Sequence, residues 1–555
     1  MVSLVTKTVK GHDYWYAVRS ERVNGKPRIV WQQYLGSAEQ IAKRLTQRPK
    51  QEITKFSSMP LGYVAAFSRV NEDLGFVEIV DRNTKKRTTG GLSVGQYLLL
   101  QLMGRVEGNL SRKAISEWYP TSIVKLMMNT PHHMNPQNLL RHLDYPTAEA
   151  IKAIEEDIAR KLIELGMSPS KLIWDTTNFF TQIEKGERIP KKGKSKEHRN
   201  DRNLIGLGLV VTDDNIPFLH ETFEANNHDS KVFSEVVDTI VERLQKLNVD
   251  TKKVVMILDK GNNSDDNISA VSDKTHVVGS IRYDQGEEYI RVPIENYKPI
   301  DETDNNKDRV LAYRTKGTHY GEEFTVVLNY NPKTHRKQQK KYEETKTRIL
   351  EELAGLKKRI ELRKRRGRPW TLKSAIRAIV DLIPLNMRSI FDYDVRKKVG
   401  RGGGLLMSFG INTVKEKMRY LSFGKLILFT DLHDWSSSDI IKAYNSKYQI
   451  EDDFKWLKNK LFIPIKPVHV RTDRHIRSHV FICLMGLLFF RYLQWKLKAL
   501  NLNFSTDNLD RVLNSIRLAL VRRGKEEKGR MVVEEMDVEQ SRLFSALSMA
   551  DFIPV

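Results

Sequence analysis

The sequence predicts a multidomain α/β protein whose central part alternates strands and helices. The chain has 555 residues, too many for one ordinary hydrophobic core, so two to four domains are expected. Residues 171–258 contain short apolar runs separated by an amphipathic segment, which favours alternating strands and helices. Residues 60–165 instead repeat apolar residues at helical spacing.

Residues 1–48 predict a β-hairpin region. Apolar and polar residues alternate from Tyr14 to Val18 and again from Ile29 to Tyr34, with Asn24-Gly25 between the two arms. Asn-Gly between two alternating runs is a strong hairpin signal. A short helix is expected to follow at 37–47.

Residues 49–166 predict a helical region. Two apolar stripes carry this prediction: Val94, Tyr97, Leu98, Leu102 and Met103, and then Ile151, Ile154, Ile158 and Leu162. A polar and basic face includes Arg105, Asn109, Arg112 and Lys113. Two interpretations stay open, a DNA-binding region and a plain helical support.

Residues 167–284 predict the first part of a catalytic core. Strands are expected at 171–176, 204–212, 216–223 and 254–258, with a helix at 229–247 before the last of them. Strand, hairpin, helix and strand is the opening order of a ribonuclease H-like fold. The remaining strand, 425–430, and a helix over 436–459 lie in the second part, 419–500. Ser436 and Asp439 are the expected N-cap pair of that helix.

Residues 285–418 predict an insertion into this core, with strands first and a long basic helix over 333–363. Residues 333–368 hold 15 Lys and Arg against 5 Glu, which suits either a solvated helix face or contact with phosphates. Arg366 to Pro369 matches the centre of an AT-hook, although Gly-Arg-Pro also ends helices. Gly400 to Gly404 is expected to be a flexible connector. A helical tail is expected at 501–555.

The charge of the chain favours a polyanionic partner. Lys and Arg number 93 against 69 Asp and Glu, a net charge of +24, and nucleic acid is the first candidate. Cys483 is the only cysteine, so a disulfide or a cysteine-based zinc site is excluded. Met1 to Lys10 lacks the apolar region of a signal peptide, and the apolar run Val480 to Phe490 is too short to span a bilayer. We therefore expect a soluble, cytoplasmic protein in which 480–490 is a buried core helix.

Three acids and three further polar residues are the candidate site. Tyr444, Lys447, Glu451 and Lys458 follow one another at intervals of three, four and seven, which place all four on one face of a single helix. Asp175 and Asp259 each end an expected buried strand. Two strand-end acids and one acid on a later helix suit a two-metal phosphoryl-transfer site, in which Mg²⁺ binds hard oxygen ligands.

The helix pattern resembles the Y-x2-R-x3-E-x6-K signature of DDE transposases from bacterial and archaeal insertion sequences, with Lys447 at the position of the family's Arg. Asp175-Thr176-Thr177-Asn178 resembles the family's D-x-T region, and Asp259-Lys260-Gly261-Asn262 its D-[RK]-G block. Residues 192–231, with the run Ser-Lys-x-His-Arg, resemble the stretch between those acids. Asp259 and Glu451 lie 192 residues apart, and a β-rich insertion there is similar to that of the branch built around insertion-sequence family four.

The resemblance implies cut-and-paste transposition by a ribonuclease H-like core. Asp175, Asp259 and Glu451 would bind two Mg²⁺ ions, for which Mn²⁺ can substitute. Tyr444, Lys447 and Lys458 would hold phosphates of the transposon end. The implied partners are double-stranded DNA, as terminal inverted repeats and as target, and a second copy of the chain in a synaptic complex, in the nucleoid of a prokaryotic cell.

Other interpretations stay open. One is a different ribonuclease H-like nuclease or a resolvase, and strand transfer on end-sequence DNA would discriminate between them. Another is a DNA-binding relative without catalysis, which the three retained acids do not favour. Trp174 and Trp456 could stack on a flipped base, or they could pack in the core.

Overall fold

The computed structural model describes residues 2–23, 26–46, 53–86, 90–128, 134–226, 229–261, 263–301, 306, 308–362, 369–398, 404–459, 462–523 and 529–554. The chain forms two compact units. One contains residues 1–65, 121–127 and 510–555, and the other contains residues 66–120 and 128–509. The fold is mixed α/β, as the sequence predicts.

The second unit is built on a nine-stranded mixed sheet, with strand order β10-β11-β12-β15-β9-β8-β5-β6-β7. At one end of it, β5, β6 and β7 form an antiparallel meander, and β8 and β9 run parallel to β5. The bounds of these five strands are β5 Lys171–Thr181, β6 Asn203–Thr212, β7 Pro217–Glu224, β8 Val255–Leu258 and β9 His276–Ile281. The remaining strands are β10 Lys298–Pro299, β11 Leu311–His319, β12 Glu322–Tyr330 and β15 Lys425–Thr430.

The strands and helix expected between 171 and 258 are all present. Asn215, in the expected hairpin turn, has a φ of 61°, a left-handed conformation that asparagine tolerates better than most residues. Helix α9, Asp229–Lys246, follows the meander. Because its apolar residues Val236, Ile240 and Leu244 recur every four positions, they lie on one face and are buried.

The prediction for the fifth strand of the core was wrong. Strand 425–430 was expected there, but β9 occupies the position beside β8. Helix α10, Asp265–Ser272, lies between β8 and β9 in the chain and returns it for a second parallel strand. β15 lies one place further out and runs antiparallel to both β9 and β12. The strands of the expected insertion therefore continue the same sheet.

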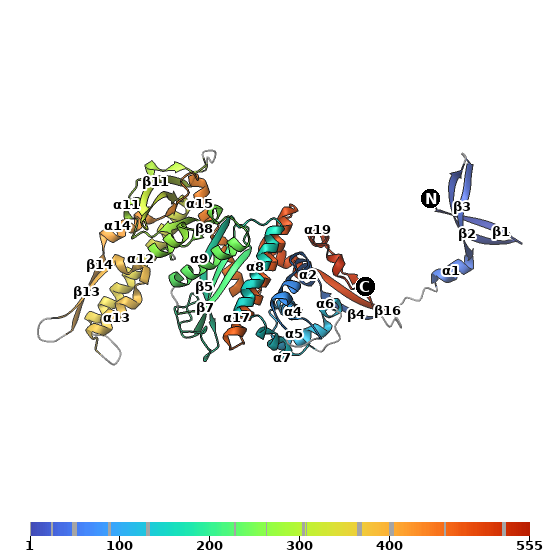
Figure 1. Ribbon diagram of the computed structural model, residues 1–555, viewed down its shortest axis with the longest axis horizontal. Coiled ribbons are helices and arrows are strands. Elements are labelled where there is room, and N and C mark those ends of the chain that lie inside the picture. Colours follow the sequence, from blue (N-terminus) through green and yellow to red (C-terminus); the bar gives the residue numbers. More distant parts are fainter. Residues whose placement is uncertain are drawn as a thin grey trace. The chain divides into compact units, whose positions relative to one another are not determined.

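A long helix, α17 Asp473–Ala499, lies in the core of the second unit and packs on β7 and on α4. It is long and apolar enough to cross a membrane, but 94% of its most apolar window is buried inside the protein. This burial confirms the predicted core helix at 480–490, and Cys483 lies buried within it. Figure 1 shows α17 beside α8 and the strands of the sheet.

Helices dominate residues 60–165, as expected. Their bounds are α2 Gly62–Leu74, α3 Phe76–Asn83, α4 Val94–Val106, α5 Arg112–Trp118, α6 Ile123–Met128, α7 Pro136–Arg141 and α8 Ala148–Glu164. Ser93 caps α4 in a capping box with Gln96, and Ser111 caps α5. The stripe Val94, Tyr97, Leu98, Leu102 and Met103 is buried.

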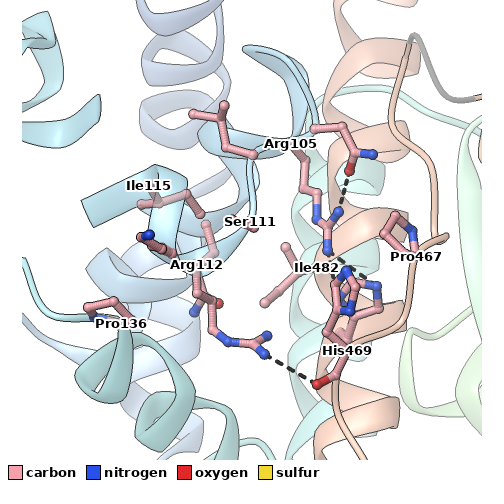
Figure 2. A pocket seen from close by; sticks show the side chains of 13 residues that line it. Arg105, Ser111, Arg112, Ile115, Pro136, Pro467, His469 and Ile482 are labelled. Atoms are coloured by element: carbon pink, nitrogen blue, oxygen red, sulfur yellow. Dashed lines mark hydrogen bonds between the residues drawn. The ribbon is translucent and has the colours of Figure 1, made fainter. Parts of the chain in front are cut away.

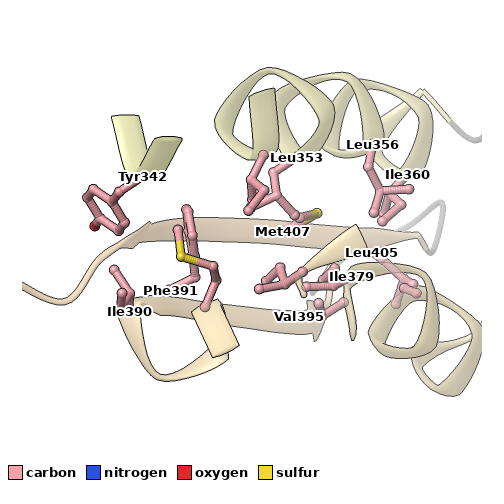
Figure 3. Close-up of a cluster of buried hydrophobic side chains, with 14 of the residues drawn as sticks. Tyr342, Leu353, Leu356, Ile360, Ile379, Ile390, Phe391, Val395, Leu405 and Met407 are labelled. Carbon is pink, nitrogen blue, oxygen red and sulfur yellow. The ribbon is translucent and has the colours of Figure 1, made fainter. Parts of the chain in front are cut away.

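The middle of the expected insertion has its own hydrophobic core (Figure 3). It is made by α12 Pro332–Glu361, α13 Leu372–Leu382, β13 Phe391–Lys397 and β14 Leu405–Ile411. Ile349, Leu353, Leu356 and Ile360 of α12 are buried in it, which confirms the apolar stripe of the long helix. α14, Thr413–Ser422, leads into β15. The AT-hook match at 366–368 and the connector at 400–403 lie outside the described residues.

The first unit contains more β structure than expected. The hairpin pairs β2 His12–Val23 with β3 Lys26–Ser37, and β1 Val2–Val9 adds a third strand. The turn residues Asn24 and Gly25 lie outside the described residues. The short helix α1 spans Ala38–Thr46.

The tail expected to be helical also contains two strands. β16 Arg517–Arg523 pairs with β17 Arg530–Val533 and with β4 Ile53–Pro60. Its helices are α18 Thr506–Ser515 and α19 Val538–Ala546. β16 and β4 are more than 450 residues apart in the sequence, so their pairing leaves no local sequence pattern.

Candidate active site

Two carboxylates lie just beyond the paired residues of the adjacent parallel strands β5 and β8. In the pairing of β5 with β8, Trp174 stands opposite Leu258, and the next residues on the two strands are Asp175 and Asp259. Because the strands run parallel, both acids reach the same edge. The backbone N–H of Thr176 donates to the Asp175 carboxylate at 2.8 Å. Asp259 directly follows the end of β8, as predicted. The strand end predicted at Asp175 was wrong, because β5 continues past it to Thr181 in its pairing with β6.

The helix expected over 436–459 is two helices. α15 spans Ser437–Asn445, α16 spans Tyr448–Lys458, and Ser446 and Lys447 form a turn between them. Ser436 accepts a hydrogen bond from the Asp439 N–H and also donates to its carboxylate, so the predicted N-cap is confirmed. The single helical face proposed for Tyr444, Lys447, Glu451 and Lys458 is correspondingly interrupted.

Tyr444, Lys447 and Glu451 nevertheless meet beside Asp259. The Lys447 ammonium lies 2.7 Å from a carboxylate oxygen of Asp259 and 3.6 Å from one of Glu451. The Tyr444 hydroxyl lies 3.5 Å from the same Asp259 oxygen and 2.8 Å from the hydroxyl of Ser280 on β9. Lys447 is largely buried, whereas the Glu451 side chain is about half exposed. One ammonium group therefore bridges two of the three predicted acids.

Lys458 lies at a different place, near the end of α16. Its ammonium donates to the Thr177 hydroxyl at 2.7 Å, two residues beyond Asp175 on β5, and lies over the ring of Phe179. Burial lowers the pKa of this lysine. The structure therefore puts Lys447 next to the second acid and Lys458 next to the strand that carries the first.

The two aspartates have opposite pKa shifts. Burial raises the pKa of Asp175 to about 6, against the attraction of the Lys196 ammonium. Burial also disfavours the charge of Asp259, but the hydrogen bond and charge of Lys447 outweigh it and hold the pKa of Asp259 below its usual value. Lys447 in turn is desolvated, yet Tyr444 and Asp259 raise its pKa. The site thus keeps Asp259 ionised and leaves Asp175 close to protonation.

The three predicted acids offer hard oxygen ligands, but among the described residues they do not stand together as one metal site. Within the part of the chain that the structure describes, no three acidic, histidine or cysteine side chains stand close enough together to hold a metal ion. However, a cation, the Lys447 ammonium, is already held between Asp259 and Glu451. The charge of Asp259 also raises the pKa of Asp175, so these two carboxylates interact electrostatically. Carboxylate oxygens are the ligands that Mg²⁺ prefers.

A comparison with protein families identifies the chain. The family described as "Transposase DDE domain" matches residues 169–489, more than half of the sequence. The chain belongs to the DDE transposase family. A comparison with proteins of curated function gives no significant match. The matched range begins just before β5 and ends within α17, so it includes Asp175, Asp259 and Glu451.

The transposase site contains one residue to which sequence reasoning gave no role. Lys196 donates to the backbone oxygen of Thr176 at 2.6 Å and is the cation that acts most strongly on Asp175. It lies in the Ser-Lys-x-His-Arg run that resembles the family, which was the available signal. Its contact with β5 depends on the path of the loop between β5 and β6, which no local pattern encodes.

The structure decides between the alternatives for Trp174. Its side chain is fully buried, and a Cβ at Gly208 on β6 would lie 2.1 Å from the indole ring. Trp174 therefore packs in the core over a glycine and is not available to stack on a base. Trp456 packs edge-to-face against Phe462 and donates its N–H to Asp452 at 3.1 Å.

A cavity of about 340 Å³ opens next to the second acid of the transposase. Lys260, which follows Asp259, lines it together with Lys341 of α12 and Arg419 of α14. Tyr283, Tyr342 and Phe423 supply aromatic walls. The expected insertion thus brings basic side chains to within one residue of the acids.

Proposed function

We propose that the chain is an insertion-sequence transposase in which Asp175, Asp259 and Glu451 are the catalytic acids of a ribonuclease H-like core. One observation carries the proposal: the first two acids are register neighbours on parallel strands, and a lysine bridges the second acid to the third. The strand order β9-β8-β5-β6-β7, with β5 to β7 antiparallel and β8 and β9 parallel, supports the ribonuclease H-like assignment.

The three carboxylates would hold two Mg²⁺ ions, with Mn²⁺ as a substitute. Bound there, the ions would supply charge stabilisation for the attacking and leaving oxygens of an in-line displacement at phosphorus. Asp259 is ready for this task because Lys447 keeps it ionised. Asp175 must also be ionised to bind metal, which its raised pKa of about 6 allows at neutral pH and disfavours below pH 6.

Lys447, Tyr444 and Lys458 are proposed to bind phosphates of the DNA strand beside the acids. The Lys447 ammonium already occupies the space between Asp259 and Glu451, where a phosphate would approach. Lysine provides a point charge rather than the bidentate fork of the arginine in the family signature. On this signature we assign the chain to the Y-R-E-K branch around insertion-sequence family four. That branch implies cut-and-paste transposition of terminal inverted repeats by a homodimer in a synaptic complex. We place the protein in the cytoplasm, at the nucleoid.

The decisive experiment is cleavage and strand transfer on a labelled duplex that carries the element's own end sequence. The DNA flanking the gene supplies this sequence if inverted repeats border the reading frame. Asp175→Asn, Asp259→Asn and Glu451→Gln should each abolish Mg²⁺-dependent cleavage and leave duplex binding measurable. The matched control is Asp381→Asn on α13, an exposed carboxylate outside the site.

Each possible result of this assay leads to a different conclusion. More than a few per cent of wild-type cleavage in any one acid variant would remove that residue from the site. Cleavage without strand transfer would instead favour a nuclease or resolvase of the same fold. Binding without any cleavage by the wild-type protein would favour a relative that has lost catalysis.

A further inference from the structure

The helical part of the transposase contains a basic cavity for which the catalytic site has no use. It has a volume of about 410 Å³ and lies between α4, α5 and α7 on one side and α17 with the segment before it on the other. This volume falls in the range of about 300–1,000 Å³ that is usual for ligand pockets. Figure 2 shows the side chains that line it.

The ionisable side chains that line this cavity are all basic. Arg105, Arg112, Lys113, His469 and His479 line it, and no Asp or Glu does so among the described residues. The pKa of His479 is well below its usual value, because of burial first and then the charge of Arg105. This imidazole is therefore neutral, and the lasting positive charges are those of the two arginines and the lysine.

The two guanidinium groups are held by neutral partners. Arg105 donates to the side-chain oxygen of Asn109 and lies 3.1 Å from Nδ1 of His479. His479 Nε2 lies 2.7 Å from the backbone oxygen of Ile465, so Nε2 carries the proton and Nδ1 accepts from Arg105. Among the described residues, Arg112 donates to the backbone oxygen of His469, at 3.5 Å (Figure 2).

Holding these charges together is unfavourable without an anion. Burial and the charge of Arg105 both lower the pKa of Arg112, so each guanidinium destabilises the other. Glu117 is 3.8 Å from Lys113, and both side chains are well exposed. Such an exposed pair neutralises little charge. A bound anion would supply the missing counter-charge.

The cavity is open to solvent at its rim. Lys113, Ser111, Pro467 and His469 on its rim are exposed. Arginine suits phosphate in particular, because its planar fork can engage two oxygens at once.

We propose that this cavity is a phosphate-binding site, in which Arg105 and Arg112 hold a backbone phosphate of the DNA bound by the transposase, apart from the phosphates at the catalytic acids. The identity of the ligand, a phosphate of DNA, rests on the proposed function. It also gives a role to the polar and basic face of α4 and α5, which is the DNA-binding interpretation of this helical region. A free nucleotide carries the same phosphate chemistry and is the competing source.

The test compares Arg112→Gln with Lys161→Gln, a control that removes one positive charge from α8 elsewhere in the helical region. Binding of a duplex is measured in EDTA from low to physiological salt. Each lost phosphate contact should reduce the slope of log K against log salt by about 0.9. We expect this reduction for Arg112→Gln, no change for Lys161→Gln, and recovery for Arg112→Lys. Lys113→Gln at the exposed rim provides the same readout if Arg112→Gln does not fold.

A thermal-shift series with millimolar dAMP and with inorganic phosphate forms the second arm. An unchanged slope, together with a dAMP shift that wild type shows and Arg112→Gln lacks, would assign the cavity to a free nucleotide. Unchanged slopes with no ligand shift would overturn the phosphate site. A wild-type chain that binds no DNA at any salt concentration would overturn the proposed function, whereas unchanged slopes in a chain that binds and cleaves DNA would overturn this inference alone.

Discussion

At the scale of single residues, Lys447 has the most connections in the site. It contacts Asp259 directly, lies within ion-pair distance of Glu451 and holds the pKa of Asp259 low. A residue in this position has two possible effects. It neutralises the second acid when no cation is bound there, and it offers a positive charge to an incoming phosphate.

Substitution of Lys447 should separate the two stages of end processing. We expect Lys447→Ala to impair double-strand breakage more than the first nick, because the strand would be held less firmly once it is cut. Lys447→Arg should be tolerated or improve activity, since a guanidinium can bind two phosphate oxygens. The measurement is cleavage of a labelled end duplex in Mg²⁺ with nicked and broken products resolved. An unchanged ratio of the two products in Lys447→Ala would mean that Lys447 has no role in processing after the first nick.

The raised pKa of Asp175 predicts a pH dependence of metal binding. With a pKa of about 6 in the folded chain, this carboxyl is mostly ionised at pH 7.5 and mostly protonated at pH 5. Because a carboxylate must be deprotonated to bind metal, Mg²⁺ affinity should fall about tenfold per pH unit below 6 and stay nearly level above 7. Calorimetric titration with Mg²⁺ at pH 5, 6 and 7.5 measures this. Equal affinity at pH 5 and 7.5 would contradict it.

The raised pKa of Asp175 also affects the stability of the fold, which it favours at low pH, whereas it favours metal binding at higher pH. The folded-state pKa of Asp175 lies above the unfolded value of about 3.9, so folding favours the neutral form. Its contribution to the free energy of unfolding is therefore present below pH 4 and is lost as the pH rises through 6, by roughly 3 kcal/mol. Asp175→Asn should remove this pH dependence, which denaturant unfolding at pH 4 and 7 can measure.

Several residues of the site could be predicted from the sequence. An acid after a buried apolar run was expected to mark a strand end, which is true of Asp259 after β8, whereas β5 continues past Asp175 to Thr181. The helical spacing of Tyr444, Lys447 and Glu451 correctly brought these three together, although Lys458 contacts another strand. Lys196 could not be given a role, because its contact with β5 depends on the tertiary path of a loop.

At the scale of elements, the position of Glu451 depends on how α16 is anchored. The helix starts after the turn at Ser446 and Lys447 and is fixed to α17 by a buried ion pair. Arg491 on α17 donates to one oxygen of Asp453 through Nε at 2.8 Å and through Nη2 at 2.5 Å. Asp453 is fully buried, and Arg491 is nearly so.

Breaking this pair should be costly, whereas replacing both partners should not. We expect Asp453→Ala to lower the free energy of unfolding by about 3–5 kcal/mol, because it removes the buried counter-charge of Arg491 and leaves only the more exposed Asp452, 3.6 Å away. The double variant Asp453→Leu with Arg491→Met should recover most of that loss, since apolar pairs of similar volume often match buried ion pairs. Urea unfolding at pH 7.5 provides the numbers. A double variant no more stable than Asp453→Ala would show that the pair itself is not the anchor.

Strand order was the part of the fold that the sequence could not supply. β9 and β15 are both six-residue strands ending near helices, and pattern alone does not distinguish them as neighbours of β8. The sheet assigns β9 to that place through the crossover by α10, and β15 to the next. The pairing of β4 with β16 was beyond prediction for the same reason, because its partners are remote in the sequence.

At the scale of the whole molecule, the net charge of +24 should govern DNA affinity. Each neutralised phosphate contributes about −0.9 to the slope of log K against log salt, so the many contacts implied here predict a steep slope. Equilibrium binding of a duplex in EDTA at several salt concentrations measures it. A slope shallower than about −2 would mean that the charge serves another purpose.

The first turns of α12 are a defined part of that charge. Lys337, Lys340 and Lys341 are exposed, whereas the apolar stripe that follows is buried in the insertion's own core, so they can be neutralised without disturbing it. Their joint substitution by Gln should reduce the slope by roughly 0.9 for each lysine that contacts a phosphate. Arg377→Gln on α13, an exposed residue, is the control. An unchanged slope would mean that this part of α12 is a solvated helix face without phosphate contacts.

The position of β15 also determines when the sheet can be completed during synthesis of the chain. This strand lies between β9 and β12, so the hairpin of β11 and β12 cannot join the sheet until residues 425–430 have been synthesised. Asp259 precedes Glu451 by 192 residues. At about 5–20 residues per second, that interval takes roughly 10–40 s on the ribosome. On the proposed assignment, a nascent transposase has two of its acids for that period without the third. It is therefore a polypeptide unable to cut DNA until about four fifths of the chain have been translated.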